Sequence, residues 1–278
     1  MSSTIWDKLG NIDYRILYAL SLILMLIPII RPIGLPTPVS ETVRGFYETI
    51  DNLPPGSVVF VSLEGSLSLL DEQEAQYIAT LKILFQRDLK VVFYSVTEDG
   101  ELIYNYLFSV VNPEKYGKKY GIDYVRLGYA PLEERGQAAV ALDVRSVYPR
   151  DFYGTPLDEI PMMKDIHNWK DVDLLIYYYT SCTNVEFAIR QWVIPYHTKC
   201  IVGTLGCCGP MAVPYFPDYI QGILSGSGAG AELEVISGNP GPGAMMNDAK
   251  NFGILGLLLF LILGNVSYLG KRFGGESE

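Results

Sequence analysis

Two uncharged stretches near the ends of the chain constrain its structure more than any motif between them. The C-terminal stretch, residues 251–270, holds about 20 residues without a charge. As a helix it would be about 30 Å long, which is the thickness of the hydrocarbon core of a bilayer. Lys271 and Arg272 follow directly, where basic side chains can meet lipid headgroups. We therefore predict a transmembrane helix over residues 251–270 and a C-terminal tail over residues 271–278.

The N-terminal stretch is shorter and lies between two arginines. Residues 16–30 would form about 22 Å of helix, so they cross a bilayer only if Arg15 and Arg31 extend their side chains toward the headgroups. A signal peptide is the alternative, but Arg31 and Pro32 stand where small residues would mark a cleavage site. We predict an N-terminal flank over residues 1–15 and a first transmembrane helix over residues 16–31.

The sequence between these anchors alternates between two hydrophobic patterns. After a proline-rich linker and a short helix (residues 32–56, the helix over 41–50), residues 57–248 are expected to form one domain. Short apolar runs predict buried strands over 57–63, 90–96, 123–127, 173–179 and 200–205. Helical spacing separates them over 70–87, 101–111, 133–147 and 186–193. This alternation predicts an α/β fold: a mainly parallel, doubly wound sheet of about five strands, Rossmann-like or crotonase-like.

Charge and cysteine usage exclude several classes of function. The formal net charge of −10 argues against nucleic acid as a partner. The four cysteines form no C-x-x-C motif, and only two histidines are present, so we expect free thiols, no metal site and no cofactor. Free cysteines and the lack of an N-x-[ST] sequon within the domain favour its placement on the cytoplasmic side. The basic residues that flank the two stretches are too evenly divided to decide the side.

The loops after the predicted strands are the places where chemistry is expected, because open parallel sheets bind ligands beyond the carboxyl ends of their strands. A membrane-bound serine hydrolase would take its nucleophile from these loops and strand ends, and the candidates are Ser62, Ser66, Ser95 and Ser181. The chain lacks the G-x-S-x-G motif, and acidic Glu98 and Asp99 follow the second strand, where they would repel an oxyanion.

Two glycine-rich segments suggest other functions. The sequence GTLGCCGP follows a predicted strand, and its backbone amides could bind a small anion or a nucleotide as a sensor would. A tight turn is the alternative. The residues of this predicted ligand site are Gly203, Gly206, Cys207, Cys208 and Gly209.

The second segment, residues 222–234, has glycines at a four-residue period. If it is helical, one face allows close approach of another backbone, from a second copy or from the same chain. The predicted interface residues are Gly222, Gly226, Gly230, Glu232 and Glu234.

Several phrases of the sequence resemble an uncharacterised family of prokaryotic membrane proteins. They are KKYGIDYVRLGY (residues 118–129), YPRD with GTPL (148–157), IPMM (160–163), GIL through GAELE (222–234) and LGN (263–265). The resemblance implies a central α/β domain between two anchors and assigns no reaction. The layout is also distantly similar to the signal-peptide peptidase A class, whose domain is ClpP- or crotonase-like.

These observations favour a structural or scaffolding subunit of a membrane complex, formed with further copies of this chain or with another membrane protein. The lipid bilayer is its other expected partner. A serine hydrolase and an anion- or nucleotide-binding sensor are the alternatives.

Overall fold

The computed structural model describes residues 12–30, 33 and 35–274. The chain divides into two compact units, residues 37–243 and the paired terminal segments 1–36 and 244–278. Most of the predicted N-terminal flank, the pair Arg31–Pro32 and the last four residues of the predicted tail lie outside the described residues.

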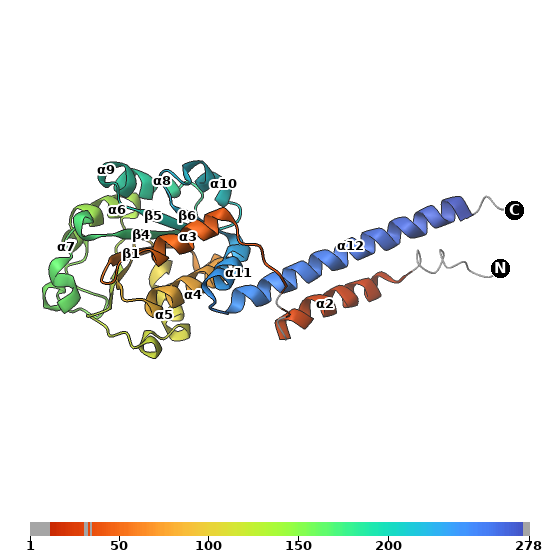
Figure 1. Ribbon diagram of the computed structural model, residues 1–278, viewed down its shortest axis with the longest axis horizontal. Helices are drawn as coiled ribbons and strands as arrows, with labels where there is room; N and C mark the ends of the chain where they lie inside the picture. The colour runs from red at the N-terminus through yellow and green to blue at the C-terminus, as the bar shows by residue number, and fades with distance from the viewer. Residues whose placement is uncertain (1–11, 31–32, 34, 275–278) are drawn as a thin grey trace. The chain divides into compact units, whose positions relative to one another are not determined.

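The larger unit is built on a parallel sheet of six strands (Figure 1). The strands are β1 (Val58–Glu64), β2 (Lys90–Ser95), β3 (Tyr124–Tyr129), β4 (Leu174–Tyr179), β5 (Cys200–Thr204) and β6 (Gly222–Ser225). Their order in the sheet is β3-β2-β1-β4-β5-β6, and every neighbouring pair is parallel. This is the strand order of the dinucleotide-binding Rossmann folds. The predicted α/β class and its parallel sheet are therefore confirmed.

Helices cover both faces of the sheet, as buried parallel strands require. One face is covered by α3 (Glu41–Asp51), α4 (Leu70–Gln86), α5 (Asp99–Val110) and α11 (Gly226–Ser237). The other face carries α6 (Glu133–Leu142), α7 (Val144–Val147), α8 (Val185–Ala188), a π-helical turn (Ile189–Val193), α9 (Ile194–Tyr196) and α10 (Gly209–Ala212). Short 3₁₀ turns lie at Leu67–Leu69, Pro113–Tyr116, Leu157–Glu159, Pro161–Asp165, Trp169–Asp171 and Val213–Tyr215.

The core on each face follows from the alternation of side chains along the strands. On β4, Tyr177 and Tyr179 belong to one hydrophobic cluster and Tyr178 to the other, and all three are fully buried. Trp192 from the π-helical turn lies in the first cluster with its ring edge-on to Phe60 of β1. The run of three tyrosines is therefore a core strand, and it offers no exposed aromatic surface to a partner.

The terminal segments contain two apolar helices, α2 (Tyr14–Ile30) and α12 (Pro242–Gly274). Within α12, residues Pro242–Gly270 are long and apolar enough to cross a membrane. Only 11% of the most apolar 18-residue stretch of this helix is buried. Helix α2 has 17 residues and contains Pro28. Among the described residues there is thus one helix of spanning length, and the predicted second span is not confirmed.

Contacts inside this terminal unit join its two segments. The backbone N–H groups of Ile33 and Leu35 donate to the carboxylate of Asp248, at 2.9 and 3.0 Å. Further along, α12 contacts α2 where Gly253 faces Met25 and Gly256 faces Leu24. The two apolar helices therefore run side by side as a pair.

Candidate functional site

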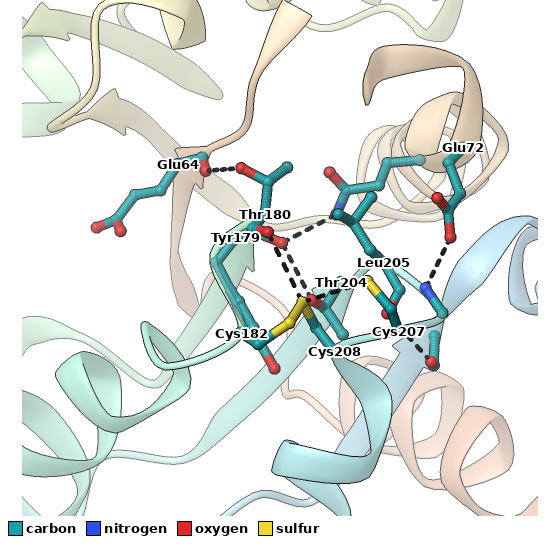
Figure 2. Close-up of a disulfide and its surroundings, with 12 residues drawn as sticks. Glu64, Glu72, Tyr179, Thr180, Cys182, Thr204, Leu205, Cys207 and Cys208 are labelled. Atoms are coloured by element: carbon teal, nitrogen blue, oxygen red, sulfur yellow. Dashed lines mark hydrogen bonds between the residues drawn. A yellow bond between two sulfur atoms is a disulfide. The ribbon is translucent and has the colours of Figure 1, made fainter. Parts of the chain in front are cut away.

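The carboxyl ends of β4 and β5 carry a disulfide that the sequence does not predict. Cys182, in the loop after β4, is bonded to Cys208, in the loop after β5 (Figure 2). The two strands are neighbours, so their following loops meet at the same edge of the sheet. The expectation of free thiols is wrong for this pair: the two cysteines are 26 positions apart, and the crossover from β4 to β5 brings them together.

A third sulfur lies beside the bonded pair. Cys207 is exposed and free, and its Sγ lies 3.8 Å from Sγ of Cys208. All three Sγ atoms of Cys182, Cys207 and Cys208 lie within 4.8 Å of one another. We call these residues the sulfur cluster. Cys200, the fourth cysteine, is buried in β5, and burial raises the pKa of its thiol.

The backbone around Cys208 is held by hydrogen bonds within its own loop, directly after β5. The N–H groups of Cys208 and Gly209 both donate to the carbonyl of Leu205, at 3.1 Å. On the other loop, the carbonyl oxygen of Thr180 lies 3.7 Å from Sγ of Cys208. The loop after β5 is therefore held in a tight turn, while the exposed Cys207 side chain stays open to solvent.

Glu64 ends β1 beside this site, at the point where the order of the strands reverses. Its buried carboxylate accepts hydrogen bonds from Tyr177 at 2.5 Å, Gln137 at 2.8 Å and Asn184 at 3.3 Å. Desolvation by burial raises the pKa of Glu64 to about 7, against the lowering effect of these three donors. The backbone carbonyl of Glu64 accepts from Thr180 Oγ1 at 3.4 Å, whereas its carboxylate points away from the disulfide (Figure 2).

The four candidate serines lie in separate local environments. Ser62 is buried and accepts from Gln137, and buried Ser95 donates to the carbonyl of Leu63, both at 2.7 Å. Ser66 hydrogen-bonds Ser68 and Asp99 on the surface. Ser181 is exposed beside the sulfur cluster. In the described part of the chain, none of them hydrogen-bonds a lysine or a histidine, and the serine hydrolase stays a prediction.

The glycines of the predicted ligand site contact other parts of the domain. A side chain at Gly203 would collide with the ring of Tyr178, because its Cβ would lie 2.0 Å from that ring, and one at Gly209 would meet Ser225 at 2.1 Å. The amide of Gly206 already donates to the carboxylate of Glu72 at 2.7 Å. Because a carboxylate takes the amide that an anion would use, this loop gives the anion-sensor hypothesis little support.

The glycines of the predicted interface do not share a helical face. Gly222 lies in β6, where a Cβ atom would lie 2.1 Å from the backbone of α3. Gly226 begins α11 with a φ of +69°, and Gly230 packs against Ala75 of α4. The close approach that these glycines permit is therefore made within the domain.

The two predicted interface glutamates also have partners inside the domain. Glu232 accepts hydrogen bonds from the N–H and hydroxyl of Ser40, at 2.8 and 2.6 Å, and buried Glu234 accepts from the N–H of Gly243 at 2.8 Å. Self-association stays a prediction, but it loses the residues on which it is based.

No protein-family model, curated protein or solved structure matches this chain.

The disulfide escapes sequence reasoning because nothing in the sequence pairs Cys182 with Cys208. The available signal is their position: each follows a predicted strand by only a few residues, and neighbouring parallel strands end at one edge. Without the strand order, that signal cannot be used.

Proposed function

We propose that this chain is a membrane-anchored thiol–disulfide redox domain whose exchange site is the sulfur cluster. The observation that supports this most strongly is the third thiol: an exposed cysteine lies beside an existing disulfide, with all three sulfur atoms within 4.8 Å. A purely structural disulfide needs no such neighbour. The location at the carboxyl ends of central parallel strands is also where doubly wound folds place their sites.

The exchange is a balanced internal reaction. The Cys207 thiolate attacks Sγ of Cys182, the Cys182–Cys208 bond breaks, and Cys208 leaves as a thiolate. Attack on Cys208 is disfavoured, because a bond between adjacent residues is strained. Cys182 can thus change its disulfide partner from Cys208 to Cys207 without an added oxidant. An external disulfide can react with the exposed thiol of Cys207, and an external thiol can attack Cys207 once that residue is bonded to Cys182.

We further propose that both α2 and α12 lie in the membrane and that the domain faces the oxidising side. The side chains of both helices are largely exposed and apolar, as lipid contact requires. The disulfide reverses the argument from free thiols for the cytoplasmic side, since disulfides persist mainly in oxidising compartments. A membrane-impermeant maleimide tests this placement: in intact cells it should label Cys207, and protection until lysis would contradict it.

The exchange itself is tested by mapping disulfides in the full-length chain in mild detergent. In a glutathione buffer that maintains the native bond, Cys208→Ser should form a Cys182–Cys207 disulfide, with glutathione disulfide taking up the two electrons. Cys200→Ser is the matched control and should keep the native Cys182–Cys208 bond. Alkylation followed by peptide mass spectrometry reads both.

Two results would contradict the proposal. One is a Cys208→Ser protein that keeps a native circular dichroism spectrum but leaves Cys182 and Cys207 as free thiols. The other is wild-type protein in which alkylation of free thiols at pH 8 always modifies Cys207 and never Cys208, because the exchange would move the free thiol from Cys207 to Cys208.

A further inference from the structure

We propose that reduction converts the sulfur cluster into a binding site for one Cu⁺ ion, held by the thiolates of Cys182, Cys207 and Cys208. This inference rests on the proposed function, because the site exists only when the disulfide has been opened. Reduction by a dithiol or a phosphine adds two electrons and two protons to the Cys182–Cys208 bond. Binding of Cu⁺ then displaces the thiol protons.

The geometry already brings the three donors close to coordination distance. A metal–thiolate bond is about 2.3 Å long, so two thiolates on one ion lie at most about 4.6 Å apart. The three Sγ atoms lie within 4.8 Å of one another while two of them are still bonded. Reduction breaks the bond between the Sγ atoms of Cys182 and Cys208, which then move apart to nonbonded contact. The three Sγ–Sγ distances in the cluster thereby become more nearly equal.

The burial of the three residues suits a bound ion. Cys208 is buried, Cys182 is half-buried and Cys207 is exposed, so an ion can enter at Cys207 and be held against the domain. The loop that carries Cys207 and Cys208 is held by the hydrogen bonds of Cys208 and Gly209 to the carbonyl of Leu205. Little backbone movement is therefore needed to bring the ligands together.

The donor set selects the ion. Within the described part of the chain, the group of side chains placed to hold a metal consists of three cysteines, without a histidine or a carboxylate. Thiolates favour soft ions such as Cu⁺, whereas structural zinc sites are almost always completed by a fourth ligand. A set of three sulfur donors, partly shielded from water, therefore favours Cu⁺ over Zn²⁺.

The test uses the full-length chain in detergent, reduced with a phosphine and freed of it under anaerobic conditions. Cu⁺ is supplied as its bicinchoninate complex, whose absorbance falls as the protein takes the ion. Reduced wild type should take up about one equivalent, and oxidised protein none. Removing a hydrogen-bond partner of a metal ligand lowers metal affinity by about 10–100-fold, and removing a ligand itself should cost at least as much. Cys207→Ser should therefore weaken Cu⁺ binding by about 10–100-fold or more. Cys200→Ala is the control and should bind like wild type.

Bound Cu⁺ should also protect the cluster from re-forming its disulfide, which alkylation followed by mass spectrometry measures separately. Equal uptake by reduced and oxidised protein, unchanged binding by Cys207→Ser, or displacement of Cu⁺ by equimolar Zn²⁺ would each overturn the inference. The two proposals fail separately. Cu⁺ binding without exchange between Cys207 and Cys208 refutes only the proposed function, and exchange without Cu⁺ binding refutes only the metal site.

Discussion

Glu64→Gln should make the stability of the domain less sensitive to pH. Glu64 is 3% exposed, and Tyr177, Gln137 and Asn184 donate to its carboxyl group without supplying a positive charge. Burial therefore favours the protonated form in the folded state, with a pKa of about 7 in place of 4.5. Glutamine has nearly the same shape and carries no titrating proton.

The expected magnitude follows from the difference between the two pKa values. At 1.36 kcal/mol per pKa unit, it corresponds to about 3 kcal/mol. Because the folded-state pKa is raised, the stabilisation is fully present below pH 4.5, where both states are protonated. It decreases as the unfolded chain ionises and is lost once the pH passes about 7. Wild type should thus lose about 3 kcal/mol relative to Glu64→Gln between pH 4 and pH 8.

Thermal unfolding of the full chain in detergent, followed by near-ultraviolet circular dichroism of the buried tyrosines, measures this difference. For a domain of this size, 1 kcal/mol shifts the Tm by about 2–4 °C, so the Tm gap between the proteins should change by about 6–12 °C from pH 4 to pH 8. The Glu64→Gln protein also faces a constant penalty of about 1 kcal/mol for its altered hydrogen bonds. Exposed Glu159→Gln serves as the control and should show a constant gap. A constant gap for Glu64→Gln would refute the reasoning.

Three further outcomes follow from the packing and the terminal helices. Gly230→Ala should destabilise the domain by about 1–3 kcal/mol in chemical denaturation, because its Cβ would lie 2.5 Å from Ala75; an unchanged midpoint would contradict that contact. Glu101→Ala should cost about 3–5 kcal/mol, because it leaves buried Arg126 without its ion-pair partner at 2.6 Å; the Glu101→Leu/Arg126→Met double variant should unfold closer to wild type than Glu101→Ala does. Tags at residues 1 and 278 should be accessible from the same side of sealed vesicles if both terminal helices span, and labelling from opposite sides would exclude that.

The sheet is predictable from the sequence because its strands carry an unambiguous pattern. Strands β1, β2, β4 and β5 are continuous apolar runs, and the pattern places each within one or two residues of its observed bounds. Strand β6 is harder to find because it is short and begins with Gly222, so its sequence merges with the glycine-rich start of α11. The helical periodicity that includes Gly222 is a coincidence of spacing, since the strand ends before Gly226.

The site is only partly predictable, because it depends on contacts between distant loops. The sequence marks the segment that holds Cys207 and Cys208 as unusual, but it offers no reason to place Cys182 there. It likewise contains no sign that Glu64 is buried, since a carboxylate that ends a strand is usually solvated. Both features arise from the order β1-β4-β5, which brings three strand ends together.

The central position of β1 has a consequence for the synthesis of the chain. One edge of β1 pairs with β2, which follows soon after it, but the other edge waits for β4. Val58 on β1 donates to Asp173 beside β4, and the two residues are 115 positions apart. At about 5–20 residues per second, a ribosome needs about 6–23 s to make that interval. Throughout this time the nascent chain presents an apolar, unpaired strand edge, so we expect its productive folding to depend on a chaperone or on slow translation more than that of a domain whose first strand lies at the rim.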